Sequence, residues 1–92
     1  MTTDRITLIG TRLKQELKPV RLSVVDESHK HAGHAGARSG MGHYHLTIVS
    51  ERFSNVQPLE RHRMVYEALG DLMKTDIHAL SIKAFAPEEF DR

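Results

Sequence analysis

The N-terminal part of the chain carries apolar residues at helical spacing. Successive members lie three or four positions apart, which places them along one side of a helix. The apolar positions between residues 3 and 17 are Ile6, Ile9, Leu13 and Leu17. Thr2 or Thr3 can cap the start of this helix, and Pro19 cannot continue it. We therefore expect a helix over residues 3–17 that buries one face.

Two segments of alternating apolar and polar residues follow, over residues 20–26 and 43–50. This alternation, rich in Val, Ile and Leu, is typical of half-buried strands, in which successive side chains point to opposite faces. His43 and His45 are expected on the exposed face of the second strand. The opposite, buried face would carry Val20, Leu22, Val24, Tyr44, Leu46 and Ile48.

The C-terminal half predicts a turn, a long helix, a strand and a short helix. Residues 51–56 are polar apart from Phe53 and Val56, which indicates a turn or one helical turn anchored by Phe53. Pro58 suits a first helical position, and apolar residues recur at helical spacing after it, so we expect the main helix from there to residues 74–76. Gly70 should weaken this helix without ending it. Pro87 begins a short terminal helix.

Residues 77–85 form the third predicted strand. Simple alternation places His78 on the same face as Leu80, Ile82 and Ala84. The same pattern places Ile77 on the opposite face with Ala79, Ser81 and Lys83.

This order of elements predicts an α+β domain. The first two strands can form an antiparallel hairpin, and the third returns after a helical crossover, which favours a parallel, right-handed connection to the second. The expected fold is a three-stranded mixed sheet with helices on one face, in a single domain over residues 1–92.

A loop over residues 27–42 joins the first two strands. It contains four glycines, little apolar surface and three histidines within six positions, His29, His31 and His34. A loop of this length in a small domain is uncommon unless it is functional or disordered, so these imidazoles are candidate metal ligands.

Composition narrows the possible functions. The 92 residues include 13 Lys and Arg, 12 Asp and Glu, and seven His, for a formal charge of +1, which is not the strongly basic balance of a dedicated nucleic-acid binder. The absence of cysteine removes disulfides and thiolate catalysis. No apolar run approaches the length of a membrane span, so we expect a cytoplasmic protein without a membrane partner.

Three motifs occur together in a fixed order. They read Val25-Asp26-Glu27-Ser28, Arg61-His62-Arg63-Met64-Val65-Tyr66 and Ile77-His78-Ala79-Leu80-Ser81-Ile82. With this set the chain resembles the BolA-like protein family over nearly its whole length. The resemblance implies a fold similar to the class II KH domain (αββααβα). It also implies complexes with monothiol glutaredoxins and roles in iron-sulfur cluster assembly or trafficking, in iron regulation and in stress responses.

The resemblance also implies cluster ligands. The last histidine of the family pattern Asp-Glu-Ser-x-x-His is His31, and the histidine that precedes Ala-Leu is His78. The loop departs from the family pattern: it is longer and lacks the acidic residue before His43, so His29 and His34 stay alternatives to His31.

The chemistry of these donors is consistent with the implied site. Imidazole binds iron, zinc and copper, and two histidines on one iron of a two-iron cluster raise its reduction potential. Without cysteine the isolated chain cannot complete a [2Fe-2S] site, so a monothiol glutaredoxin with glutathione would supply the sulfur ligands. The expected protein is a binding module and not an enzyme, and it is a monomer or weak dimer by itself.

Two other functions are weighed against this one. Some bacterial family members are described as transcriptional regulators, and DNA could be contacted by Arg52, Arg61, Arg63 and Lys83. The segment where a KH domain carries its Gly-x-x-Gly loop has no glycine here, and Glu60 and Glu67 could equally well pair with the arginines. A zinc hydrolase that uses the three loop histidines ranks lower, because no rigid element fixes a carboxylate base near them. His62 lies on the apolar stripe of the main helix, where a buried structural role is expected.

Overall fold

The computed structural model describes residues 4–27 and 42–90. Its first element is helix α1 (Arg5–Leu17), in which Ile9, Leu13 and Leu17 of the predicted stripe are buried, whereas Ile6, in the first turn, is 40% exposed. The helix is capped by Asp4, whose carboxylate accepts a hydrogen bond from the Thr7 amide at 2.9 Å. The expected cap by a threonine one or two positions earlier was therefore wrong.

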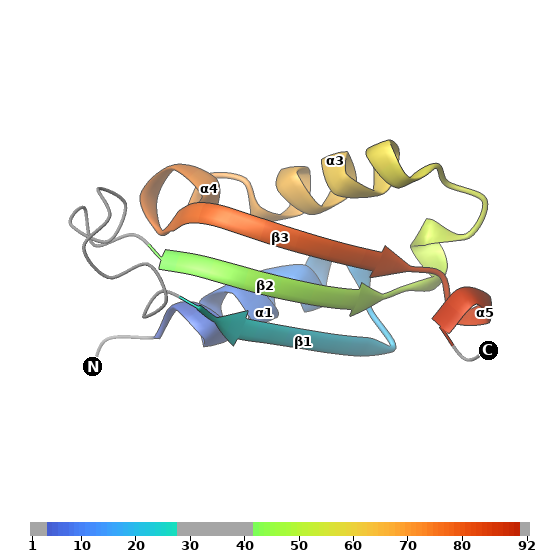
Figure 1. The fold of residues 1–92 in the computed structure, drawn as a ribbon, viewed down its shortest axis with the longest axis horizontal. Helices are drawn as coiled ribbons and strands as arrows, with labels where there is room; N and C mark the ends of the chain where they lie inside the picture. Colours follow the sequence, from blue (N-terminus) through green and yellow to red (C-terminus); the bar gives the residue numbers. More distant parts are fainter. Residues whose placement is uncertain (1–3, 28–41, 91–92) are drawn as a thin grey trace.

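The sheet has three strands in the order β1-β2-β3: β1 (Arg21–Asp26), β2 (Gly42–Val49) and β3 (Ile77–Phe85). β1 and β2 are antiparallel, and β3 is parallel to β2. Consequently β1 ends at the same end of the sheet at which β2 and β3 begin (Figure 1). The predicted α+β fold with a mixed sheet is confirmed.

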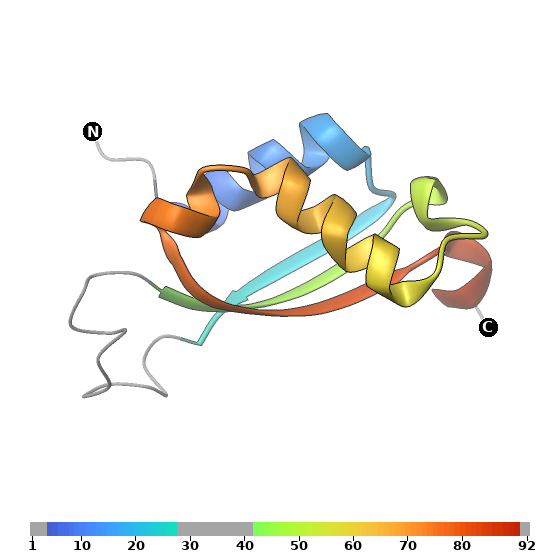
Figure 2. The same ribbon diagram turned by 90° about the horizontal axis from the view of Figure 1, so that it is seen from above.

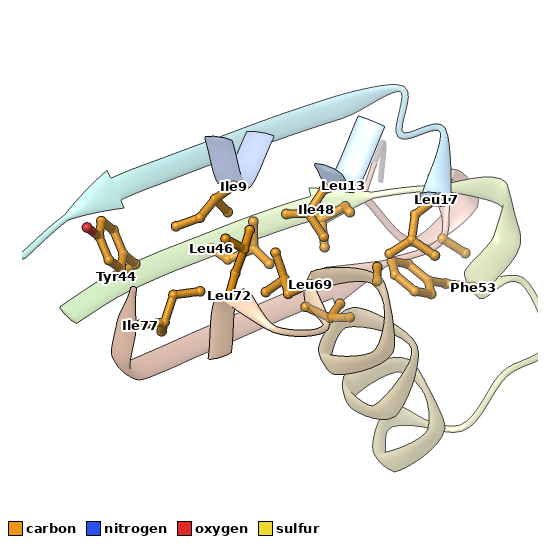
Figure 3. Close-up of a cluster of buried hydrophobic side chains, with 13 residues drawn as sticks. Ile9, Leu13, Leu17, Tyr44, Leu46, Ile48, Phe53, Leu69, Leu72 and Ile77 are labelled. Carbon is orange, nitrogen blue, oxygen red and sulfur yellow. The ribbon is translucent and has the colours of Figure 1, made fainter. Parts of the chain in front are cut away.

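Helices α1, α3 (Pro58–Leu69) and α4 (Leu72–Thr75) cover one side of the sheet (Figure 2). The buried side chains of the helices and of the covered sheet face pack into one cluster, shown in Figure 3. Its members are Ile9, Leu13, Leu17, Tyr44, Leu46, Ile48, Phe53, Val65, Ala68, Leu69, Leu72, Ile77 and Ala86. Of the described helices only the short α5 (Pro87–Phe90) lies against the other sheet face, which we call the open face. The Phe90 ring is 5.6 Å from that of Phe85 at the end of β3 and lines a hollow with Ser23 and Thr47.

The predicted main helix is divided at Gly70. This residue ends α3 with φ 52°, a backbone conformation that glycine adopts far more readily than other residues. After Asp71 the chain forms the single-turn helix α4. The expectation that Gly70 would not end the helix was therefore wrong.

Two short elements close the far end of the sheet. The 3-10 helix η2 (Glu51–Phe53) buries Phe53 completely, as its predicted anchoring role requires, and α5 (Pro87–Phe90) follows β3. Ser50, between β2 and η2, is fully buried and donates a hydrogen bond from Oγ to the Leu17 carbonyl at 2.6 Å. This bond ties the end of β2 to the end of α1.

Candidate histidine site at one end of the sheet

The candidate histidine site lies at the end of the sheet where β2 and β3 begin. Glu27 and Gly42, the described residues on either side of residues 28–41, both lie here. The Glu27 amide donates to the His43 carbonyl at 2.8 Å, and the Gly42 amide donates to the Asp76 carbonyl at 3.0 Å. The predicted ligands His29, His31 and His34 lie outside the described residues.

A register shift brings His78 onto the open face. Gly42 pairs with Ile77 but His43 pairs with Ala79, so His78 is an extra residue in β3, as in a β-bulge. Because of this insertion, Ile77 faces the helices and is buried instead of lying on the exposed side. The predicted placement of His78 with Leu80, and of Ile77 on the opposite face, was wrong, because alternation cannot anticipate an inserted residue.

His78 lies against His43 of the neighbouring strand. The centroids of the two imidazole rings are 5.0 Å apart and the ring planes are tilted by 49°. His43 belongs to the open face, opposite the buried Tyr44, as the alternation predicts. The His78 side chain is exposed and that of His43 is half-buried. The sequence placed both residues on strands but did not predict their contact.

The same open face carries His45, two positions along β2. Its Nδ1 lies 3.9 Å from Oε1 of Glu27, close enough for charge attraction and too far for a hydrogen bond. The carboxylate of Glu27 therefore lies beside the histidine-bearing end of the sheet. No group of three His, Cys, Asp or Glu side chains in residues 4–27 and 42–90 is arranged to hold a metal ion.

On the covered face of this end, a hollow is lined by Arg5, Asp26, Tyr44 and Asp76, among others. Arg5 Nε lies 3.2 Å from Asp76 Oδ2. A hydrogen bond from Thr75 Oγ and the Arg5 contact together lower the pKa of Asp76. Burial, followed by the charge of Asp26, raises the pKa of the Tyr44 phenol. These groups anchor the start of β3 to the start of α1.

The four cations that could contact DNA differ in how far their side chains are exposed and already bonded within the fold. Arg61 is only 8% exposed, and its guanidinium donates to the carbonyls of Val56 at 2.8 Å and Ala84 at 3.0 Å. The same guanidinium binds both carboxylate oxygens of Glu89, at 2.6 and 3.1 Å. Its donors are therefore used within the fold, and a partner or nucleic acid would meet the other three cations.

The remaining cations, Arg52, Arg63 and Lys83, are exposed and lie on three different elements, η2, α3 and β3. Arg63 pairs with Glu60 at 3.0 Å, as the helix spacing predicts. Arg52 borders a hollow whose lining also contains Glu16 and Glu67. Lys83 lies on the open face of β3, opposite Thr47, near the end of the sheet from which η2 follows.

His62, predicted to be buried, is half-buried on α3. No helix in the described part of the chain is long and apolar enough to cross a membrane.

Comparison with known proteins identifies the family. A family model described as BolA-like protein matches residues 13–89. SufE-like protein 1, chloroplastic/mitochondrial, of Arabidopsis thaliana is 44% identical over 86 residues, which cover 88% of this chain but only 23% of that relative. DNA-binding transcriptional regulator BolA of Escherichia coli (strain K12) is 37% identical over 83 residues, or 90% of this chain and 76% of the regulator.

A solved structure supports the same relationship. The BolA domain of SufE1 from Arabidopsis thaliana superposes with a TM-score of 0.83 at 42% identity, covering 97% of this chain and 99% of that domain. Sequence and fold thus agree over nearly all of the chain, and the protein belongs to the BolA-like family.

Proposed function

We propose that this chain is a binding module that shares a [2Fe-2S] cluster with a monothiol glutaredoxin and glutathione, in iron-sulfur cluster trafficking or in iron and stress regulation. The observation that carries the proposal is the position of His78. Its imidazole is exposed at the end of the sheet where Glu27 and Gly42 flank the segment that contains His29, His31 and His34. One ligand from β3 and one from that segment would then serve a common iron.

The donor set of this chain fits a shared cluster and not a self-contained one. The sequence has no cysteine, and the described residues offer no group of three potential ligands. Imidazoles from this chain would tune the reduction potential of the cluster, while the glutaredoxin and glutathione provide sulfur. In this role the protein binds and positions the cluster and catalyses no reaction of its own. The cytoplasmic location stays a prediction, since the SufE-like relative is named for chloroplasts and mitochondria.

Anaerobic reconstitution tests the proposal. The chain and a monothiol glutaredoxin are mixed with glutathione, iron and sulfide, and the visible circular dichroism spectrum is compared with that of the glutaredoxin alone. We expect a distinct spectrum with the wild-type chain and its loss with His78→Ala. His62→Ala, on α3, is the matched control and should retain the spectrum. An unchanged spectrum with His78→Ala contradicts the proposal, and single replacements of His29, His31 and His34 identify the second ligand.

DNA binding is the second candidate, because the Escherichia coli relative is named as a DNA-binding regulator. With Arg61 committed to the fold, contacts to phosphates would depend on Arg52, Arg63 and Lys83. Affinity for duplex DNA should fall with salt, and each lost phosphate contact should reduce the slope of log K against log salt by about 0.9. Arg63→Glu and Lys83→Glu should weaken binding if these contacts exist. Equal affinity of the wild type and both variants would exclude this mode of binding.

A further inference from the structure

We propose that His43 and His78 together form a two-imidazole site for a divalent transition-metal ion, and that Zn²⁺ binds there without any partner protein. The site follows from the register shift in β3, which places the two side chains on the same face at the same end of the sheet. It differs from the cluster site in using His43, a residue of β2, and in requiring neither sulfur ligands nor residues 28–41.

The spacing of the rings suits a shared ion. Two imidazoles bound to one tetrahedral Zn²⁺ through Zn–N bonds of about 2.0–2.1 Å have ring centroids about 5 Å apart. The observed centroids of His43 and His78 are 5.0 Å apart. The 49° tilt between the ring planes shows that the rings are not stacked face to face.

The backbone holds both ligands on strands. The Glu27 amide binds the carbonyl of His43, and the Gly42 amide binds the carbonyl of Asp76, two residues before His78. Ligands on paired strands keep their separation better than ligands on a loop, which lowers the cost of ordering the site when the ion binds.

The charges near the pair favour a cation. Glu27, directly after β1, lies on the open face, with Oε1 3.9 Å from His45 Nδ1. Lys83, a cation on the open side of β3, pairs with Thr47, about 13 Å along β2 from His43 at the usual rise per residue. Two imidazoles leave two tetrahedral positions for water, one more than in the usual open zinc site with three protein ligands.

Zinc titration of the 92-residue chain tests this site. In a variant with Asn at positions 29, 31 and 34, calorimetry should find one Zn²⁺ per chain, and the imidazole NMR signals of His43 and His78 should shift together. His43→Gln and His78→Gln should each weaken binding at least tenfold, whereas His62→Gln should not. Full affinity in His43→Gln, or a shift of the His78 signals alone, overturns the proposal.

The NMR measurement uses a protein that retains both His43 and His78. It therefore tests the site even if replacing one of them disturbs the fold. The two proposals can also fail separately. Zinc binding that is lost in His43→Gln, together with a glutaredoxin spectrum that the wild-type chain does not alter, supports the zinc site alone. Zinc binding that persists in His43→Gln, together with a distinct glutaredoxin spectrum that is lost in His78→Ala, supports the shared cluster alone. Because both sites use His78, zinc in excess should also prevent His78 from altering the glutaredoxin spectrum.

Discussion

Arg61 and Glu89 form a two-point ion pair that joins helix α3 to helix α5. The distances are 2.6 Å from Nη1 to Oε1 and 3.1 Å from Nη2 to Oε2, and the arginine side chain is 10% exposed against 45% for the glutamate. The same guanidinium also donates to two backbone carbonyls, of Val56 and Ala84. A single side chain therefore connects the start of α3, the end of β3 and the C-terminal turn.

Replacement of Arg61 should destabilise the fold. Arg61→Met removes the guanidinium donor from two carbonyls and from the Glu89 carboxylate, which keeps only its bond from the Ala86 amide among those described, and we expect the free energy of unfolding to fall by about 2–3 kcal/mol. Arg63→Met is the matched control: its ion pair is exposed on both sides, so its loss should change stability by about 0.5 kcal/mol or less. Urea unfolding followed by circular dichroism measures both values. Equal effects of the two replacements would show that Arg61 has no structural role.

Gly42 should tolerate no side chain, because Tyr44 occupies the space. A Cβ at Gly42 would lie 2.5 Å from the hydroxyl of Tyr44 and 2.6 Å from two of its ring carbons, and that ring is packed in the core. Gly42→Ala should therefore lower the free energy of unfolding by about 1–3 kcal/mol.

Gly10 provides the opposite case within the same protein. It lies inside α1, and the nearest atom to an added Cβ is Cδ2 of Leu22 at 3.8 Å, an ordinary contact. Gly10→Ala should raise stability by about 0.5–1 kcal/mol through helix propensity. Thermal unfolding should thus shift in opposite directions for Gly42→Ala and Gly10→Ala, and shifts of the same sign would contradict the packing assigned to Gly42.

The fold was predictable because its main elements carry their own periodic patterns. The stripe of α1 and the alternation of β2 are local signals, and both correspond to the observed burial. The crossover from β2 to β3 passes through a helix, which fixes a parallel pairing. The three sequence motifs indicated the BolA-like family, and the family model that matches residues 13–89 confirms it.

The details that were missed depend on contacts between distant residues. The insertion at His78 is set by how β3 pairs with β2, and no pattern within residues 77–85 reveals it. The exposed-looking Arg61 is buried because Glu89, 28 positions away, folds back onto it. The contact of His43 with His78 follows from the same register shift, so alternation could place each residue on a strand but could not pair them.

Acid should weaken the attachment of β3 to α1 through Asp76. The hydrogen bond from Thr75 Oγ, then the Arg5 contact, lower the pKa of this carboxyl below its ordinary value of 3.8, so the folded state favours the carboxylate. The unfolded chain therefore binds a proton more readily than the folded chain. The contribution of Asp76 to stability is fully present above pH 3.8 and is lost as the pH falls through the lower folded-state pKa.

Asp76→Asn removes this titration. In urea unfolding between about pH 5 and about pH 3, the loss of stability with acid should be smaller in Asp76→Asn than in the wild type. Thr75→Val keeps the carboxylate but removes its strongest donor, so its pH dependence should lie between those of the wild type and Asp76→Asn. Parallel curves for the wild type and Asp76→Asn would mean that this carboxyl has the same pKa folded and unfolded, and that Arg5 and Thr75 do not hold it in its charged form.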